Sequence, residues 1–265
     1  MAKYGIENWE RFQRSGVTPE DIKAMKVETV REAFADTKAD FKHLVEQLAK
    51  GIKEGRWTAM LGDDVSGRHV ANVIGRLATR YASEYGQKAP ERIFFAGGGL
   101  YDAFPDEESQ KGRTGKELME EKQRNLKKYI QEQAQRLGDH VLLVTEHIMG
   151  GRTVHQIGQI LEQQGIKYDV ATLWTGGELE DLKSPENNWY TGKEKAGASG
   201  PFGSEVSNVL YKLGVPLNEA AGIKKHDTDA VAKRDDSADR ELVSVAREET
   251  TRLTDELYAE YFSEK

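Results

Sequence analysis

The chain has 265 residues, of which 38 are basic and 45 are acidic, and its formal net charge is −7. This excess of acid argues against a nucleic-acid-binding face spread over the whole surface, although it leaves room for a local basic pocket. The chain contains no cysteine, which excludes disulfides, thiolate metal sites and cysteine nucleophiles. No apolar run is long enough to span a bilayer, and the first residues lack the apolar core of a signal peptide. We therefore expect a soluble, cytoplasmic protein with neither nucleic acid nor membrane as a partner.

Residues 1–56 are expected to form an N-terminal helical segment. Thr18 is a suitable N-cap, Pro19 suits the first helical position, and Asp21 follows three residues after the cap. A second helix is predicted from an apolar stripe that Gly55 can close. The stripe contains Phe41, Leu44, Val45, Leu48 and Ile52. We expect these helices to pack on a sheet.

The next segment has the pattern of a strand, a loop and a helix. Residues 57–61 are apolar except for Thr58, residues 62–68 contain two glycines, and residues 69–81 carry apolar positions at helical spacing. A helix that starts directly after such a loop can present backbone N–H groups to an anion. The alternative is a solvent-exposed loop with a surface arginine, Arg68.

A long polar stretch follows the next predicted strand, at 92–96. It extends from Tyr101 to about Lys116 and includes Lys111 and Arg113. Loops of this length within a compact domain are usually lids or disordered segments. A helix is predicted from about residue 116 to residue 137.

The central stretch of the chain, 141–154, combines a buried strand with a glycine loop. Residues 141–144 are apolar and two of the four are β-branched. Gly150 and Gly151 allow a tight loop, and a helix begins near Thr153. Free N–H groups and the helix dipole would point at an anion bound there. An ordinary turn between strand and helix, without a ligand, is the alternative. A further strand at 168–174 completes a βαβ unit, which requires parallel strands.

The central stretch resembles the PRPP-binding motif of type I phosphoribosyltransferases. Glu146 falls on the second acidic position of that motif, Gly151 on its glycine and Thr153 on its closing hydroxyl. Two positions differ, because Thr145 replaces the first acidic residue and Gly150 replaces the usual threonine or serine. The segment from Asp64 to Arg68 is also similar to the pyrophosphate loop of some family members. The resemblance covers roughly residues 57–174.

The resemblance implies an α/β fold, with a parallel twisted sheet flanked by helices and with N- and C-terminal helical additions. It implies that Glu146 contacts the ribose of PRPP, and that Lys111 and Arg113 reach the departing pyrophosphate from a mobile loop. It further implies that backbone and side-chain groups bind the two phosphorylated ends of PRPP. The 5′-phosphate would be bound by Gly150, Gly151, Arg152 and Thr153, and the pyrophosphate by Ser66, Gly67 and Arg68.

The activity implied is transfer of a phosphoribosyl group to a nitrogenous base, an enzymatic step of nucleotide metabolism. Mg²⁺ is the implied cofactor, without a direct protein ligand except for Glu146 acting through water. PRPP and a small base or nucleotide are the implied partners, and a homodimer is the family-based expectation. Two alternatives stay open: a PRPP- or nucleotide-binding regulator that has lost turnover, which Thr145 favours, and an unrelated α/β hydrolase or kinase.

Residues 57–236 are assigned to the phosphoribosyltransferase-like domain, and its part from about 178 to 236 is expected to form a variable hood. Residues 187–190 and 196–203 have the composition of loops, with a short helix at 204–213. Trp189, Tyr190 or Phe202 could stack on the acceptor base, although packing is the commoner role of such aromatic residues. The last helix, within 237–265, presents an apolar face that suits either the core or a dimer interface.

Overall fold

The computed structural model describes residues 18–63, 67–95, 115–148, 151–176, 187–194, 218–224 and 228–263. Five strands form a sheet in the order β2-β1-β3-β4-β5, and every neighbouring pair is parallel. The strands are β1 (Ala59–Asp63), β2 (Glu91–Phe95), β3 (His140–Ile148), β4 (Lys167–Thr175) and β5 (Trp189–Glu194). The predicted α/β class with a parallel sheet is confirmed.

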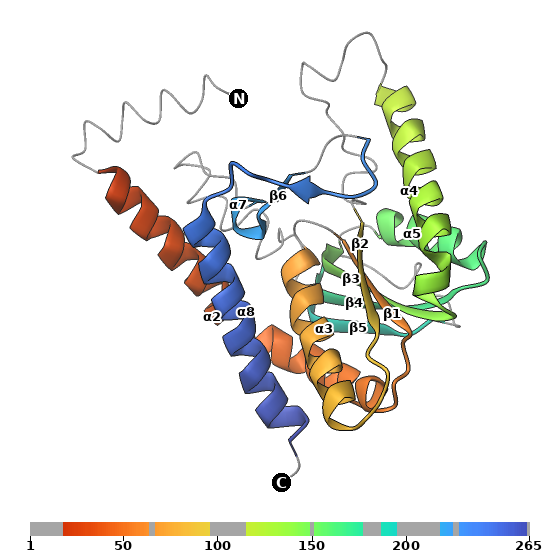
Figure 1. Cartoon of the computed structure of the whole chain (residues 1–265), viewed down its shortest axis with the longest axis horizontal. Coiled ribbons are helices and arrows are strands. Elements are labelled where there is room, and N and C mark those ends of the chain that lie inside the picture. Colours follow the sequence, from red (N-terminus) through yellow and green to blue (C-terminus); the bar gives the residue numbers. More distant parts are fainter. Residues whose placement is uncertain are drawn as a thin grey trace.

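Helices cover both faces of this sheet, so the protein has three layers (Figure 1). One layer contains α2 (Pro19–Lys53), α3 (Gly67–Glu84) and α8 (Arg240–Tyr261), and the other contains α4 (Gly115–Leu137) and α5 (Arg152–Glu162). Alternate residues of β3 supply the two cores: Leu142 and Val144 face the first layer, while Val141 and Leu143 face the second. Coverage on both faces explains why these strands are continuous apolar runs.

Helix α8 packs on the core through one apolar face. Of the two roles expected for this face, core or dimer interface, the structure shows the core. Its buried residues include Leu242, Val245, Ala246, Leu253 and Leu257. A short helix, α7 (Asn218–Ala221), and a small antiparallel pair, β6 (Ile223–Lys224) with β7 (Lys233–Arg234), precede it. None of the described helices combines the length and the apolarity that a membrane crossing needs.

The N-terminal segment differs from its prediction, because the structure has one helix of 35 residues where two were expected. The predicted start is correct: the Thr18 side chain accepts a hydrogen bond from the Asp21 N–H, and the Asp21 carboxylate accepts one from the Thr18 N–H. No glycine or proline interrupts the chain between Pro19 and Gly51. The buried stripe therefore continues without a break from Val30 to Ile52.

The predicted loop at 187–190 is wrong from Trp189 onward, because β5 begins there and pairs with β4. Asn188 is fixed by the Asp169 carboxylate, which accepts hydrogen bonds from its backbone N–H and its side-chain amide. Gly192 lies against two backbone oxygens, with room for no more than a hydrogen atom.

Tyr190 packs edge-on against Trp57, with 6.0 Å between ring centroids. Its ring therefore packs against the core of the first layer, and its hydroxyl accepts a hydrogen bond from Arg56.

We predict that Gly192→Ala destabilises the protein. A Cβ atom at this position would lie 2.6 Å from the Asp40 carbonyl oxygen and 2.7 Å from the Leu173 carbonyl oxygen, and backbone atoms cannot rotate away. We expect a loss of about 1–3 kcal/mol in the free energy of unfolding, measured by urea denaturation. Lys193→Ala, at the exposed neighbouring position, is the control and should stay within about 0.5 kcal/mol of the parent. An unchanged midpoint for Gly192→Ala would contradict the packing of β5 against α2.

Candidate functional site

The carboxyl ends of β1 and β3 define the candidate site, because the strand order reverses between them. From β1 the chain leaves through α3 on one face of the sheet, and from β3 it leaves through α5 on the other face. In open parallel sheets this reversal leaves a crevice at the strand ends, where ligands bind. The two loops predicted to bind phosphate groups follow these two neighbouring strands.

Gly67 is the first residue of α3, and its position depends on the absence of a side chain. A Cβ atom there would lie 3.1 Å from the Thr145 Cα atom and 3.4 Å from the Glu146 nitrogen. The N-terminus of α3 therefore abuts the carboxyl end of β3. This end of a helix carries free N–H groups and partial positive charge, and the structure places it at the crevice. Ser66, the preceding candidate, lies outside the described residues.

Gly151 caps the N-terminus of α5 in the left-handed conformation, with φ of +61°. No side chain caps this helix, so its first-turn N–H groups receive no side-chain acceptor from the N-cap residue. Thr153, the second residue of the helix, is half-buried. Arg152 contributes the first helical backbone position, and its side chain is not among the described groups. Gly150 also lies outside the described residues.

Glu146 lies within β3 and is only 2 % exposed. Its backbone lies beneath the start of α3, because the Glu146 nitrogen is 3.4 Å from the position that a Cβ atom of Gly67 would occupy. A sugar hydroxyl can reach this carboxylate only by displacing groups that enclose it.

Asp63 is a carboxylate at the crevice that the sequence analysis did not single out. It is the last residue of β1 and is buried. Its Cβ atom lies 3.3 Å from the position that a Cβ atom of Gly67 would occupy. Its place directly after a short apolar strand, within the glycine-containing segment 62–68, is the sequence signal that could have indicated it.

The side chain of Arg68 extends away from the crevice. Its guanidinium carbon lies 4.7 Å from the ring centroid of Phe94, which belongs to β2, on the side of β1 opposite to β3. The predicted contact of this side chain with a ligand between β1 and β3 therefore requires it to leave Phe94.

Lys111, Arg113 and Phe202 lie outside the described residues, as does the predicted helix at 204–213.

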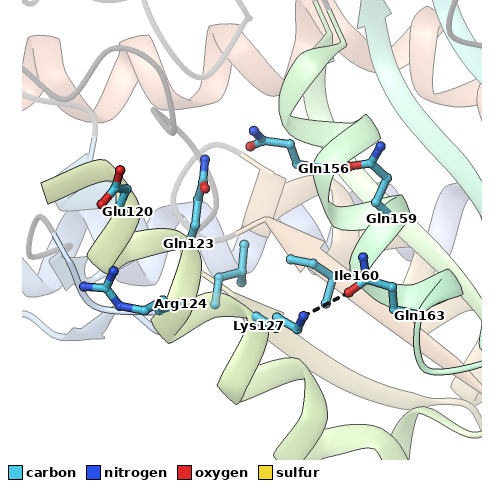
Figure 2. Close-up of a pocket in the computed structure, with 9 residues that line it drawn as sticks. Glu120, Gln123, Arg124, Lys127, Gln156, Gln159, Ile160 and Gln163 are labelled. Atoms are coloured by element: carbon cyan, nitrogen blue, oxygen red, sulfur yellow. Dashed lines mark hydrogen bonds between the residues drawn. The ribbon is translucent and has the colours of Figure 1, made fainter. Parts of the chain in front are cut away.

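A groove between α4 and α5 is a separate feature, with a volume of about 380 Å³ (Figure 2). Its described lining comes from these two helices and is rich in amides, including Gln123, Gln156 and Gln159. Lys127 donates a hydrogen bond of 3.0 Å to the Gln163 side chain across it. The groove lies on the helical layer, and none of its described lining residues belongs to the sheet.

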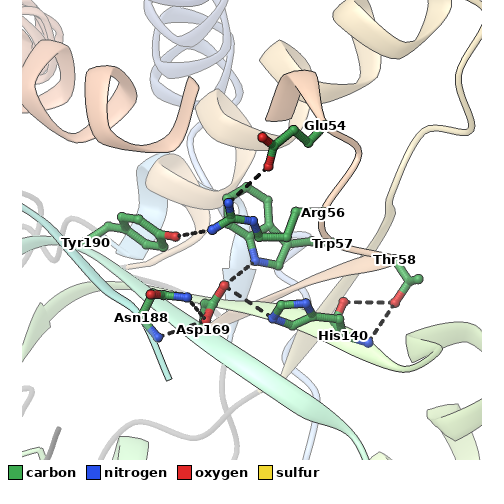
Figure 3. Close-up of polar contacts among 8 residues, drawn as sticks. All are labelled: Glu54, Arg56, Trp57, Thr58, His140, Asp169, Asn188 and Tyr190. Atoms are coloured by element: carbon green, nitrogen blue, oxygen red, sulfur yellow. Dashed lines mark hydrogen bonds and ion pairs between the residues drawn. The ribbon is translucent and has the colours of Figure 1, made fainter. Parts of the chain in front are cut away.

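The amino ends of the strands carry a buried polar cluster around Asp169, which is 1 % exposed (Figure 3). One carboxylate oxygen accepts a hydrogen bond of 2.9 Å from the Trp57 indole and lies 3.2 Å from the His140 Nε2 atom. The other oxygen accepts both hydrogen bonds from Asn188. Because this carboxylate joins the segments that enter β1, β3 and β5, its role is structural.

Comparisons of the chain with protein-family models, with curated proteins and with solved structures find no match. The described residues also contain no group of three His, Asp or Glu side chains that could hold a metal ion.

We predict that Asp169→Ala destabilises the fold by about 3–5 kcal/mol, the usual cost of removing one partner from a buried charged cluster. The substitution leaves the Trp57 indole and the Asn188 amide without their acceptor. Asp236→Ala is the matched control, because Asp236 is exposed and pairs with exposed Arg234, and such pairs contribute little. Trp57→Phe, which removes one donor, should cost about 1–3 kcal/mol. Equal urea midpoints for the Asp169 and Asp236 variants would contradict the structural role.

Proposed function

We propose that this protein binds PRPP in the crevice between β1 and β3 and transfers the phosphoribosyl group to a nitrogenous base. The observation that carries the proposal is that two helix N-termini follow the neighbouring strands β1 and β3 at one crevice, with Gly67 as the first residue of α3 and Gly151 as the N-cap of α5. PRPP carries a phosphate at one end of its ribose and a pyrophosphate at the other. Two neighbouring anion-binding helix ends suit such a ligand.

The N-terminus of α5 is the proposed site of the 5′-phosphate. Gly151 and Arg152 would contribute backbone N–H groups, and Thr153 would contribute its hydroxyl. The N-terminus of α3 would bind the pyrophosphate through Ser66, Gly67 and the backbone N–H of Arg68. Glu146, which lies beneath this helix end, would bind the ribose hydroxyls once the ligand has entered.

The proposed reaction breaks the bond between C1 of the ribose and the pyrophosphate oxygen and forms a bond between C1 and a nitrogen of the base, which loses its proton. Positive charge develops on the ribose and negative charge on the pyrophosphate, so fixed dipoles at the two helix ends would assist the step. Mg²⁺ would bind mainly to oxygens of PRPP and to water, with Glu146 as the one carboxylate proposed to reach it through water. When bound, it would neutralise charge on the leaving group.

A regulator that binds PRPP or a nucleotide without turnover is the second candidate function. Two observations favour it. Thr145 stands where the resembled family has the first of two acidic residues, and the remaining acid, Glu146, is enclosed. A ligand could then be held mainly by the two helix ends, with little contact between the protein and the ribose.

PRPP with Mg²⁺ is predicted to raise the melting temperature of the full chain. A ligand present at a hundred times its Kd adds about 2.7 kcal/mol to the free energy of unfolding. Thr153→Ala should weaken PRPP binding by about 1–3 kcal/mol through loss of the hydroxyl, whereas Thr153→Ser, which keeps the hydroxyl, should bind like the parent. Isothermal titration calorimetry gives these affinities. Equal PRPP affinity of the alanine variant and the parent would remove Thr153 from the site.

Gly151→Ala offers a second measurement, with Gly165→Ala as its control. Both glycines have positive φ, +61° and +71°, and they flank the two ends of the same helix, so the strain of an added side chain is similar. Only the Gly151 variant is expected to lower PRPP affinity. If both variants lost the same affinity, the effect would belong to the stability of α5.

Release of pyrophosphate distinguishes the two candidate functions. The purified chain is incubated with PRPP, Mg²⁺ and each of a panel of purine, pyrimidine and pyridine bases, and pyrophosphate is measured. Release that depends on one base supports the transferase. Binding of PRPP without release across the panel supports the regulator, and absence of binding overturns both.

A further inference from the structure

Several positively charged side chains gather outside the crevice, in a cavity of about 240 Å³ between α3 and α8. Three arginines line it: Arg68 and Arg76 from α3 and Arg247 from α8. Asn72 and Thr250 add polar groups to the same wall. None of the described residues that line this basic pocket is acidic.

Two of the arginines are held in place by neighbouring groups. Arg68 lies over the Phe94 ring at 4.7 Å, an arrangement that favours a cation above an aromatic face. Arg76 donates a hydrogen bond to the Thr251 hydroxyl. Arg247 also lines the pocket, and its side chain is exposed to solvent. The pocket therefore has two positioned guanidinium groups and one that is accessible to solvent.

The charge of the basic pocket is opposite to that of the chain. The protein has 45 acidic and 38 basic residues, yet the described lining contains three arginines and no acid. Like charges brought together disfavour one another unless an anion offsets them. Nearby His69 is buried, and burial together with the Arg68 charge lowers the pKa of its imidazole to about 4. His69 is thus neutral at physiological pH and adds no further positive charge.

The donors in the basic pocket suit phosphate oxygens. A guanidinium presents donors in a planar fork and has no acceptor, so it pairs with phosphate through two parallel hydrogen bonds. A volume of about 240 Å³ is below the range of about 300–1,000 Å³ that is usual for sites of drug-sized ligands. It suits an anionic group better than a whole nucleotide.

We infer that the pocket formed by Arg68, Arg76 and Arg247 is a second anion site, which binds the phosphate or diphosphate group of a small phosphorylated ligand. This site uses arginine side chains on the α8 flank of α3, whereas the proposed PRPP crevice uses the helix N-termini, with Ser66, Glu146 and Thr153, at the β3 flank. The two sites can therefore be tested independently.

Inorganic pyrophosphate is the probe, titrated calorimetrically into the full-length protein at low ionic strength. Arg247→Gln is expected to weaken its binding by roughly 10- to 100-fold, the range for losing hydrogen bonds to a charged group. Arg247 is exposed, so the melting temperature without ligand should not change. Arg76→Gln should weaken binding similarly. Arg31→Gln is the control, because it removes the same charge from the exposed surface of α2, where the Arg31 guanidinium lies 3.8 Å from the Glu28 carboxylate.

The outcomes separate this site from the proposed PRPP site. Pyrophosphate affinity that falls with Arg247→Gln and Arg76→Gln, but not with Arg31→Gln or Ser66→Ala, supports the second site whether or not PRPP binds. Affinity that falls with Ser66→Ala alone places pyrophosphate in the crevice and overturns the inference. Equal loss in the Arg31 and Arg247 variants, or no pyrophosphate binding, also overturns it.

Discussion

The parallel pairing of β1 with β3 is the constraint on which the candidate site depends. Leu61 pairs with Leu143 and Gly62 with Val144, so β1 ends beside Thr145 of β3, and β3 continues to Ile148. The lack of a side chain at Gly62 lets α3 lie close, since a Cβ atom there would be 2.8 Å from the Ala71 Cβ atom. Gly67 can then meet β3 directly. A different neighbour for β1 would separate the two helix N-termini and leave no shared crevice.

Helix α8, at the C-terminal end of the chain, packs along α3 and so helps to hold α3 against the sheet. Arg80 pairs with Asp255 at 3.0 Å, and the Tyr258 hydroxyl donates a hydrogen bond of 2.5 Å to the Glu84 carboxylate. Burial, and then this hydrogen bond, raise the pKa of Tyr258, while the same bond lowers the pKa of Glu84. Exposed ion pairs contribute little singly, so the apolar face of α8 supplies most of the stabilisation. By fixing α3, the C-terminal helix helps to position Gly67.

Strong local signals made much of this fold predictable from the sequence. Apolar β-branched runs indicated the buried central strands, and the Thr18 capping box gave the start of α2 correctly. β5 was missed because an edge strand with Thr191, Gly192 and Lys193 lacks an apolar run, and its register comes from contacts with β4 and Asp169. The pattern also failed to show that β3 continues past Glu146, since the polar residues 145–147 look like a loop in sequence.

The basic pocket was not predictable for a different reason. Arg68 and Arg76 are separated by two helical turns, which the sequence of α3 alone indicates, but Arg247 joins them only because α8 packs beside that helix. The candidate glycines and hydroxyl of the crevice could be proposed from the sequence because they lie within short segments that have a pattern of their own. Chemistry carried by one loop is visible in sequence, whereas chemistry assembled between helices requires their packing.

The two proposed anion sites share the first turn of α3, and their electrostatics have the same sign. The helix dipole places partial positive charge at Gly67, and the Arg68, Arg76 and Arg247 side chains add full charges on the neighbouring flank. On a chain with a net charge of −7, this region is a local exception. Such a region attracts anions over distances comparable to the Debye length, about 8 Å at physiological ionic strength. A phosphorylated ligand drawn to either site would therefore approach the end of the molecule where the carboxyl ends of β1 and β3 lie.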